Sequence, residues 1–337
     1  MAEAVVVEVA GREVTITSPD KVFFAARGDT KLALVNYYLA MEDVVMRAMI
    51  DRPVLMQRFP SGAGGSSFFQ KRVGDGAPEW LSTTIVSTPN GTESRALVVA
   101  DLAHLLWAVN LGCLGFHAWA TRASDPAHCD ELRIDLDPGP GTTFAMAQEA
   151  AAATKALFDE LGVRSYIKTT GNRGLHVYVR LLPRWDSYAV RSAAVAVARE
   201  LARRHPTLVT DAWWKEQRGE RIFIDFNQNA PHKTVFAAWS VRAREHASVS
   251  CGFRWDELAS IHPDDLTIAT VPARIAADGD PWADMDEHPQ TLEPFLEMAR
   301  LDAERGLPDA PWPPVYPKMA GEEPRVAPSR AKKPKPA

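Results

Sequence analysis

One short segment limits the possible folds of this chain more than any other: an apolar strand with two acids on one face, ended by Pro138-Gly139. Residues 133–139 read Arg-Ile-Asp-Leu-Asp-Pro-Gly. Side chains alternate between the faces of a strand, so Asp135 and Asp137 share one face while Ile134 and Leu136 point into a core. The pattern therefore predicts two acids at the C-terminal end of a strand, where α/β sheets commonly bind ligands.

This acidic pair needs a source of compensation. Two carboxylates at this spacing repel each other unless a cation lies between them or one is protonated. Hard divalent ions such as Mg²⁺ prefer carboxylate oxygens and keep coordination places for water and phosphate. The alternative is a pair of solvent-facing acids at a strand end. We favour a metal site.

A second acidic strand follows at residues 221–227, which read Arg-Ile-Phe-Ile-Asp-Phe-Asn. Asp225 is flanked by apolar residues, an unfavourable position unless the carboxylate is paired or binds a metal. A third carboxylate would complete the set that two-metal phosphoryl transfer needs. The alternative is a salt bridge to Arg218 or Arg221.

A glycine turn lies between the two acidic strands. Gly171 and Gly174 bracket it, and its backbone N–H groups together with Arg173 could hold phosphate oxygens. The spacing excludes a P-loop. His176 begins the alternating strand that follows, where a lone histidine is more often structural than functional.

Strands and helices alternate through the centre of the chain, which predicts an α/β layered core. Valines alternate around Gly11 and predict a hairpin over residues 5–17. The periodicity of apolar residues predicts strands at 54–59, 81–87, 95–100, 131–137, 164–169, 175–181 and 221–226, and helices at 31–50, 101–110, 143–161 and 187–204.

The composition is that of an ordinary globular protein, with 46% hydrophobic and 24% charged residues. The formal net charge is -5; residues 325–337 hold five basic residues and no acid, so the remainder carries -10. Nucleic-acid contacts would therefore depend on local basic patches. The three cysteines form no CxxC pair, which argues against a disulfide framework.

The ends of the chain differ from its centre. The N-terminus lacks the basic start and apolar run of a signal peptide, and the sequence contains no apolar run of about 18 residues that could span a membrane. We expect a cytoplasmic, nucleoid-associated protein. Proline is frequent after residue 306, which predicts a catalytic domain over residues 1–306 and a disordered Pro/Lys-rich tail over 307–337.

The order Asp-x-Asp, Gly-x-x-Gly-x-His and apolar-Asp resembles the three motifs of the archaeo-eukaryotic primase superfamily. The chain is most similar to the polymerase domain of bacterial DNA ligase D, the non-homologous end-joining enzyme, and to stand-alone actinobacterial relatives of that domain. The similarity extends from about Thr17 to Ile268. It includes Ser18-Pro19-Asp20-Lys21-Val22-Phe23, Phe68-Phe69-Gln70-Lys71, Asn110-Leu111, His117-Ala118-Trp119, Asn227-Gln228-Asn229-Ala230, Lys233-Thr234, Ser240-Val241-Arg242-Ala243-Arg244 and Trp255-Asp256-Glu257-Leu258.

The resemblance implies a primase-polymerase fold, α/β (α+β) in class, with an antiparallel-rich central sheet in a cleft flanked by helices. It also implies roles for individual residues. Asp135, Asp137 and Asp225 would be catalytic and bind two Mn²⁺ or Mg²⁺ ions. The other implied contacts are with the incoming nucleotide for Thr170, Arg173, His176, His117, Gln228 and Arg242, with a base for Phe68 and Phe69, and with a DNA 5′-phosphate for Lys21 and Lys31.

The second motif departs from the family pattern Ser-Gly-Ser-Lys-Gly-Leu-His. Thr170, Asn172 and Arg173 replace the two serines and the lysine. Arginine keeps the charge of lysine but changes its geometry. A zinc site formed by Cys113, His117, His128 and Cys129 is a remote alternative because the ligand spacing is unusual.

The expected reaction is nucleotide addition to a primer 3′-end at a short gap or break in DNA, with NTPs preferred over dNTPs. A separate DNA ligase and an end-binding protein are the expected partners. Three alternatives remain: a primase that starts chains without a primer, a non-catalytic module that bridges DNA ends for a ligase, and a metal-dependent phosphodiesterase.

Overall fold

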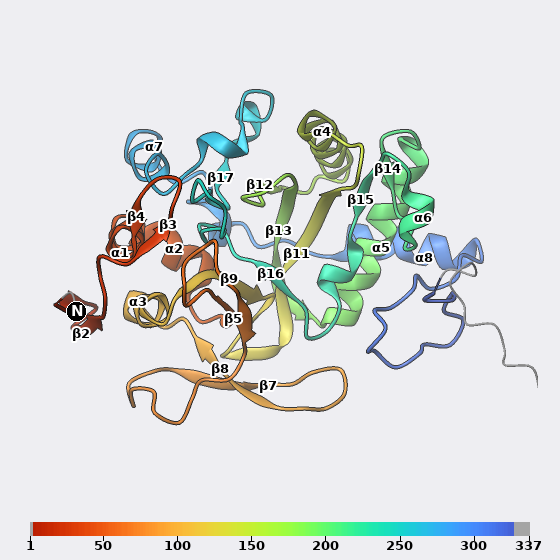
Figure 1. Ribbon diagram of the computed structural model, residues 1–337. Coiled ribbons are helices and arrows are strands. Elements are labelled where there is room, and N and C mark those ends of the chain that lie inside the picture. The colour runs from red at the N-terminus through yellow and green to blue at the C-terminus, as the bar shows by residue number, and fades with distance from the viewer. Residues whose placement is uncertain (1–2, 327–337) are drawn as a thin grey trace, which may run out of the picture.

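A computed structural model describes residues 3–326, and two β-sheets with their covering helices form its frame (Figure 1). The larger sheet is antiparallel except between β14 and β15. Its order is β14 (Val209–Thr210), β15 (Ile222–Ile224), β11 (Asp125–Pro138), β13 (Leu175–Trp185), β12 (Tyr166–Thr169) and β17 (Gly252–Phe253), with β10 (Thr121–Arg122) paired to β11.

The smaller sheet is antiparallel throughout. It has the order β16 (Thr234–Phe236), β9 (Cys113–Trp119), β5 (Pro53–Arg58), β8 (Ser94–Val98) and β7 (Thr83–Val86), with β6 (Phe68–Gln70) paired to β5. Two hairpins lie outside these sheets: β1 (Val5–Val9) with β2 (Arg12–Ile16), and β3 (Val22–Phe24) with β4 (Asp29–Thr30). This arrangement confirms the expected α/β class and the antiparallel-rich sheets.

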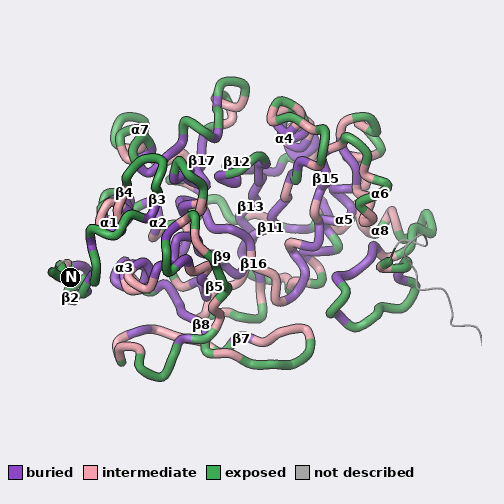
Figure 2. The backbone as a smooth tube through the Cα atoms, in the orientation of Figure 1, coloured by how far each residue is buried: buried purple, intermediate pink, exposed green. Residues whose placement is uncertain are grey.

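Helices cover the two sheets separately. The larger sheet carries α4 (Phe144–Glu160) and α5 (Ser187–Arg204), and α8 (Glu293–Glu304) packs on α5. Next to the smaller sheet lie α1 (Lys31–Ala40), α2 (Glu42–Met49) and α3 (Leu102–Asn110). The remaining elements are α6 (Lys215–Arg218), α7 (Val271–Asp278), η1 (Phe226–Asn229), η2 (Trp255–Glu257), η3 (Pro263–Asp265) and η4 (Met285–Glu287). In Figure 2 the central strands are buried, and the loop between β7 and β8 is exposed at residues 90–93.

Most predicted elements are present, with local differences. The helix predicted over residues 31–50 is two helices that meet at Met41, where the backbone leaves the helical conformation. The turn of the first hairpin lies at Ala10-Gly11, with φ angles of 50° and 70°, as a tight two-residue hairpin turn requires. The periodicity of apolar residues did not predict strand β9, the strand that carries His117.

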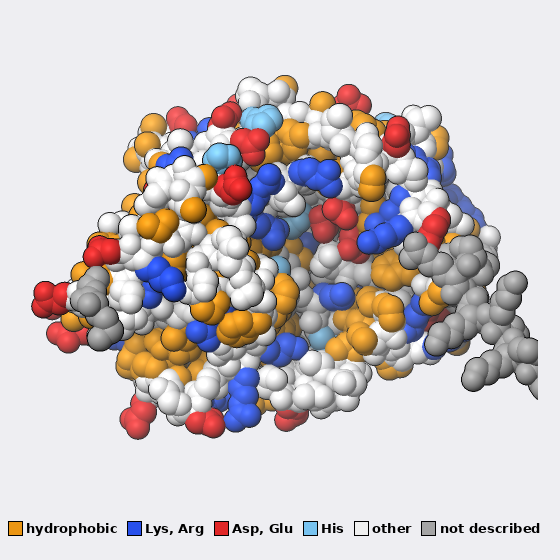
Figure 3. Space-filling view, in the orientation of Figure 1, with side chains coloured by type: hydrophobic (Ala, Val, Ile, Leu, Met, Phe, Trp, Pro, Cys, Tyr) orange, Lys and Arg blue, Asp and Glu red, His pale blue; other side chains and the backbone are white. Residues whose placement is uncertain are grey.

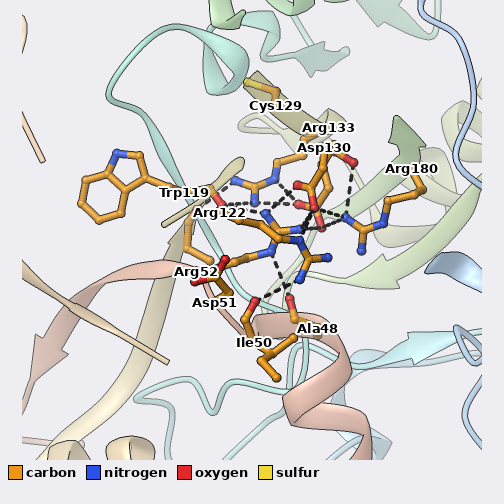
Figure 4. A network of polar contacts seen from close by, with 12 residues as sticks. Ala48, Ile50, Asp51, Arg52, Trp119, Arg122, Cys129, Asp130, Arg133 and Arg180 are labelled. Atoms are coloured by element: carbon orange, nitrogen blue, oxygen red, sulfur yellow. Dashed lines mark hydrogen bonds and ion pairs between the residues drawn. The ribbon is translucent and has the colours of Figure 1, made fainter. Parts of the chain in front are cut away.

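A buried cluster of ion pairs joins residues of β11 and β13 to Arg52 (Figure 4). Arg52, just before β5, donates to Asp130 Oδ2 at 2.9 Å and to Glu131 Oε1 at 2.8 Å. Arg180 on β13 contacts the same two acids, and Arg133 Nε donates to Glu131 Oε2 at 2.8 Å. All five side chains are at least nine-tenths buried. Each charge in this cluster therefore has an opposite partner.

The cluster also links the two sheets. Arg133 on β11 donates to the backbone oxygens of Ala118 and Trp119 at the end of β9, each at 2.8 Å. Arg52 donates to the Trp119 oxygen at 3.3 Å. The middle of β11 is thus fixed to the smaller sheet, and Asp135 and Asp137 lie beyond it toward the C-terminal end of the strand.

Residues 308–326 differ from the predicted disordered tail. They form a strap, called here the C-terminal strap, that packs on α5 and η1 (Figure 1). Trp312 and Tyr316 are buried and cluster with Ala230. The prediction of disorder rested on the proline content and did not take these two aromatic residues into account. The remainder of the predicted tail, residues 327–337, lies outside the described residues.

Candidate active site

The two acids of β11 lie where the strand pattern placed them, on one face near its C-terminal end. Asp135 pairs across the sheet with His176 on β13, and His176 pairs with Lys168 on β12, so the three side chains form a row on one face. His176 Nε2 lies 3.2 Å from Asp135 Oδ1. Asp137 is the next residue on that face and is exposed.

The acids repel one another. Burial raises the pKa of Asp135 to about 6. Burial and the charge of Asp135 together raise the pKa of Asp137, and the same two causes raise the pKa of Asp225 to about 6. Neighbouring cations offset these effects only in part. The site therefore holds negative charge that favours a bound cation.

Asp225 lies directly after β15, and its backbone N–H donates to the backbone oxygen of Asp135 at 2.9 Å. Its carboxylate caps η1, accepting from the Asn227 N–H at 3.1 Å and from Gln228 Nε2 at 2.8 Å. Arg218 and Arg221 donate to backbone oxygens instead, and neither forms an ion pair with Asp225 within the described residues. The salt-bridge alternative for Asp225 is therefore wrong.

The glycine turn closes on itself through Thr170. The Thr170 hydroxyl accepts from the N–H groups of Asn172 and Gly174, each at 3.2 Å, so these two groups do not point at a ligand as expected. Both glycines are required by their surroundings. Gly171 has φ of 70°, and a Cβ at Gly174 would lie 2.7 Å from the Leu136 oxygen.

The turn and the acids enclose one hollow of about 140 Å³. Six of the predicted residues line it: Asp135, Asp137, Thr170, Arg173, His176 and Arg242. Figure 3 shows a group of acidic side chains among Lys and Arg side chains in the hollowed middle of this face. Negative and positive groups thus face one small space.

Arg242 joins the turn to the smaller sheet. Its Nε donates to the Thr170 oxygen at 2.8 Å, and its guanidinium carbon lies 3.5 Å from the Phe236 ring centroid. Burial lowers the pKa of Arg242 to about 10, so the group stays cationic near neutral pH. Arg173 is exposed and donates to the Pro138 oxygen at 3.3 Å.

On the smaller sheet, the predicted site residue His117 lies among aromatic side chains. The His117 ring on β9 has edge contacts with Phe69 at 5.3 Å and Phe236 at 5.1 Å. Burial, followed by the charge of Arg242, lowers the pKa of His117 to about 3, so the ring is neutral. Within residues 3–326 its Nε2 atom is buried and has no hydrogen-bond partner.

Phe68 and Phe69 on β6 are 47% and 57% exposed, which excludes a pair buried in the core. The Arg58 guanidinium lies 5.2 Å from the Phe68 ring centroid. Exposed aromatic faces beside a cation can stack on unpaired bases.

Lys21 and Lys31 lie together, and the Lys31 N–H donates to the Lys21 oxygen at 2.8 Å. Lys31 is buried, and its ammonium donates to the Thr17 oxygen at 2.5 Å and the Asn110 oxygen at 3.0 Å. Lys21 donates to the Pro60 oxygen at 2.5 Å. Burial and the charge of Lys21 lower the pKa of Lys31. Neither lysine has an acidic partner in the part of the chain described.

Metal binding would require rearrangement of these side chains. Between residues 3 and 326, no three His, Cys, Asp or Glu side chains are gathered closely enough to form a ligand set. The four residues of the zinc alternative form no such group either, and the three cysteines are free and buried. Both carboxylate oxygens of Asp225 already accept hydrogen bonds, from the Asn227 N–H and from Gln228 Nε2. The donor chemistry of the three carboxylates nevertheless suits a hard divalent cation.

The sequence interpretation missed two cations near the acids. Lys168 is fully buried and donates to Ser250 Oγ at 2.6 Å. A lysine within an apolar strand next to the strand of His176 could have been recognised from the sequence as a candidate site residue. Arg218 was considered only as a salt-bridge partner, yet its charge lowers the pKa of the nearby Asp137. Its position depends on α6, which the sequence pattern did not predict.

Among residues 3–326, no helix is both long and apolar enough to cross a membrane. A family model of the LigD primase-polymerase domain matches residues 30–282. The multifunctional non-homologous end joining protein LigD of Mycolicibacterium smegmatis is 33% identical over 275 residues, which are 81% of this chain and 36% of that protein. The bifunctional non-homologous end joining protein LigD of Bacillus subtilis is 32% identical over 278 residues, 81% of this chain and 44% of that protein. The chain thus spans less than half the length of these relatives.

A solved structure has the same architecture. The polymerase domain of Mycobacterium tuberculosis ligase D, in complex with DNA, aligns with a TM-score of 0.77 and 31% identity over 82% of this chain and 99% of that chain. The match to the family model, the identity with the LigD proteins and the shared fold agree with the order of the three motifs. The chain belongs to the LigD primase-polymerase domain family.

Proposed function

We propose that this protein is a DNA-repair nucleotidyltransferase that extends primer 3′-ends at short gaps or breaks and prefers NTPs to dNTPs. One observation carries the proposal: Asp135 and Asp137 share a single hollow with Thr170, Arg173 and Arg242. Acids that can bind divalent cations and arginines that can bind phosphate are the two groups that a nucleoside triphosphate requires.

In the proposed reaction the primer 3′-oxygen forms a bond to the α-phosphorus of the nucleotide. The bond to the β-phosphate bridging oxygen breaks, pyrophosphate leaves, and the hydroxyl proton passes to solvent. Two divalent cations, Mn²⁺ or Mg²⁺, would lower the pKa of the 3′-hydroxyl and stabilise the developing charge when bound by Asp135, Asp137 and Asp225. Arg173 and Arg242 would hold the triphosphate, and Gln228 would contact it after releasing Asp225.

The smaller sheet would hold the nucleic acid and the sugar. Phe68 and Phe69 are exposed and would stack on a base. The neutral His117 ring would contact the sugar of the incoming nucleotide, because its Nε2 atom has no other partner within residues 3–326. Lys21 and Lys31 form a pair of cations without acidic partners in that range and would attract a terminal 5′-phosphate, which carries more charge than an internal phosphodiester. A separate ligase and an end-binding protein would complete the repair.

The test uses the full chain and DNA with a one-nucleotide gap, a labelled primer and a downstream 5′-phosphate. With Mn²⁺ or Mg²⁺ we expect addition of one nucleotide, matching release of pyrophosphate, faster use of NTPs than dNTPs, and less extension when the downstream end is a 5′-hydroxyl. Release of nucleotide monophosphate would instead indicate a phosphodiesterase, and synthesis on unprimed DNA a primase. Binding without extension would indicate an end-bridging module.

A further inference from the structure

The C-terminal strap contacts the same short helix, η1, that Asp225 caps. We infer that the strap is a positioning element of the active site, which acts on Asp225 through Arg191 and Asn227. The inference rests on the proposed function, because it takes Asp225 as a metal-binding acid. It concerns a segment outside residues 30–282, the part of the chain that the family model matches.

The strap is anchored by buried groups. Trp312 and Tyr316 are 4% and 7% exposed, and the Tyr316 hydroxyl donates to the Pro231 oxygen, next to Ala230 in the same cluster. The buried Glu322 accepts from the N–H of Trp312 at 2.8 Å. These contacts give the segment a defined position against the loop that follows η1.

Arg191 of α5 connects the strap to η1. Its side chain is 2% exposed, and its guanidinium carbon lies 3.7 Å from a ring centroid of Trp312. Nη2 donates to the Ala310 oxygen at 2.7 Å, while Nε donates to Asn227 Oδ1 at 2.7 Å. One buried guanidinium thus binds strap and active-site helix together.

Asn227 completes the connection. Its Nδ2 donates to the strap oxygen of Pro311 at 2.9 Å, and its backbone N–H donates to Asp225 Oδ1 at 3.1 Å. The side-chain amide of Asn227 is therefore held on both sides, by Arg191 and by the strap, and the backbone N–H of the same residue holds the Asp225 carboxylate. Groups that orient a metal ligand from behind commonly affect metal affinity without touching the metal.

A second set of contacts supports the same role. The indole N–H groups of Trp213 and Trp214 donate to the strap oxygens of Arg325 at 3.1 Å and Pro324 at 3.0 Å. These tryptophans lead into α6, which ends at Arg218, whose charge acts on Asp225 and Asp137. The strap thus contacts the chain on both sides of β15, before and after the strand that delivers the third acid.

The test measures Mn²⁺ binding to the full chain without DNA or nucleotide, by the electron paramagnetic resonance signal of free Mn²⁺. Arg191→Met keeps the apolar stem but removes the hydrogen bonds to Asn227 and to the strap. We expect it to raise the half-saturating Mn²⁺ concentration roughly tenfold or more, with the thermal unfolding transition still cooperative. The matched control is Arg199→Met on the same helix, because Arg199 donates to the strap oxygen of Pro308 without contacting Asn227.

Asn227→Ala cuts the connection at its other end and is expected to have the same effect. Asp225→Asn distinguishes the proposed metal role of Asp225 from the inferred role of the strap. If it leaves Mn²⁺ affinity unchanged, the proposed metal role of Asp225 fails. If it weakens binding but Arg191→Met and Asn227→Ala match wild type, only the role of the strap is overturned. Loss of folding in both of these variants, or an equal effect of Arg199→Met, would likewise show that the strap contributes stability rather than positioning.

Discussion

The middle and the C-terminal end of β11 carry charge in opposite ways. Near its middle, Asp130 and Glu131 are buried against Arg52 and Arg180, and every charge has a partner within hydrogen-bond distance. At its C-terminal end, Asp135 and Asp137 repel each other and form no ion pair with Lys or Arg within the described residues.

This difference separates two uses of buried charge. A paired cluster can fix the sheets, because the attraction offsets the loss of hydration. Unpaired acids destabilise the fold and are retained where a ligand supplies the missing charge. The same strand thus joins the sheets with one half and forms the candidate active site with the other.

The largest expected effect comes from removing the unpaired charges. Asp135→Asn combined with Asp137→Asn should reduce primer extension by about 10³-fold or more, because the cation-binding groups are lost. DNA affinity should stay equal or rise, since negative charge beside the phosphates disappears. Gel-based extension and fluorescence anisotropy measure the two properties. Substantial extension by the folded double variant would contradict the site.

The next effect concerns the paired charges. Arg52→Met should lower the free energy of unfolding by about 3–5 kcal/mol, because Asp130 and Glu131 would keep their burial and lose their main partner. Urea unfolding measures the change. Lys155→Met on α4 is the control: both side chains of its pair with Asp159 are partly exposed, and the pair should contribute less than about 1 kcal/mol. If the two variants lowered the free energy of unfolding equally, the buried cluster would contribute no more to stability than a partly exposed ion pair.

A smaller effect is expected from pH. Burial raises the pKa of Asp130 and Glu131, but the neighbouring arginines lower both pKa values further, so the net shift is downward. An acid with a lowered pKa in the folded state stabilises the fold above its unfolded pKa of about 4, and this stability is lost as the pH falls further. Urea unfolding at pH 5, 4 and 3 should show a steep loss in wild type and a shallower loss in Asp130→Asn. Parallel curves would exclude the cluster as the source.

Local patterns predicted the part of the site that one strand can define. Alternation in β11 placed Asp135 and Asp137 on one face, and the helix pattern over residues 187–204 matches α5. The partners of the other half of β11 were not predictable from such patterns. Arg52 lies 78 residues before Asp130, and only the packing of the two sheets brings them together.

The strap illustrates the same limit. Its proline content predicted disorder, yet Trp312 is held by Arg191, a residue more than a hundred positions earlier. The closed turn at Thr170 could not be predicted either, because backbone geometry decides whether its N–H groups face a ligand or the Thr170 hydroxyl. Motif order identified the family; side-chain pairing required the structure.

The most direct measurement of the central claim compares Asp135→Asn with Asp130→Asn in stability and in primer extension. We predict that Asp135→Asn leaves the free energy of unfolding unchanged or raises it by about 1 kcal/mol while extension is lost. Asp130→Asn should lower that free energy by about 3 kcal/mol while the folded fraction still extends primers. The account would be contradicted if both variants lost stability equally, or if Asp135→Asn retained full extension.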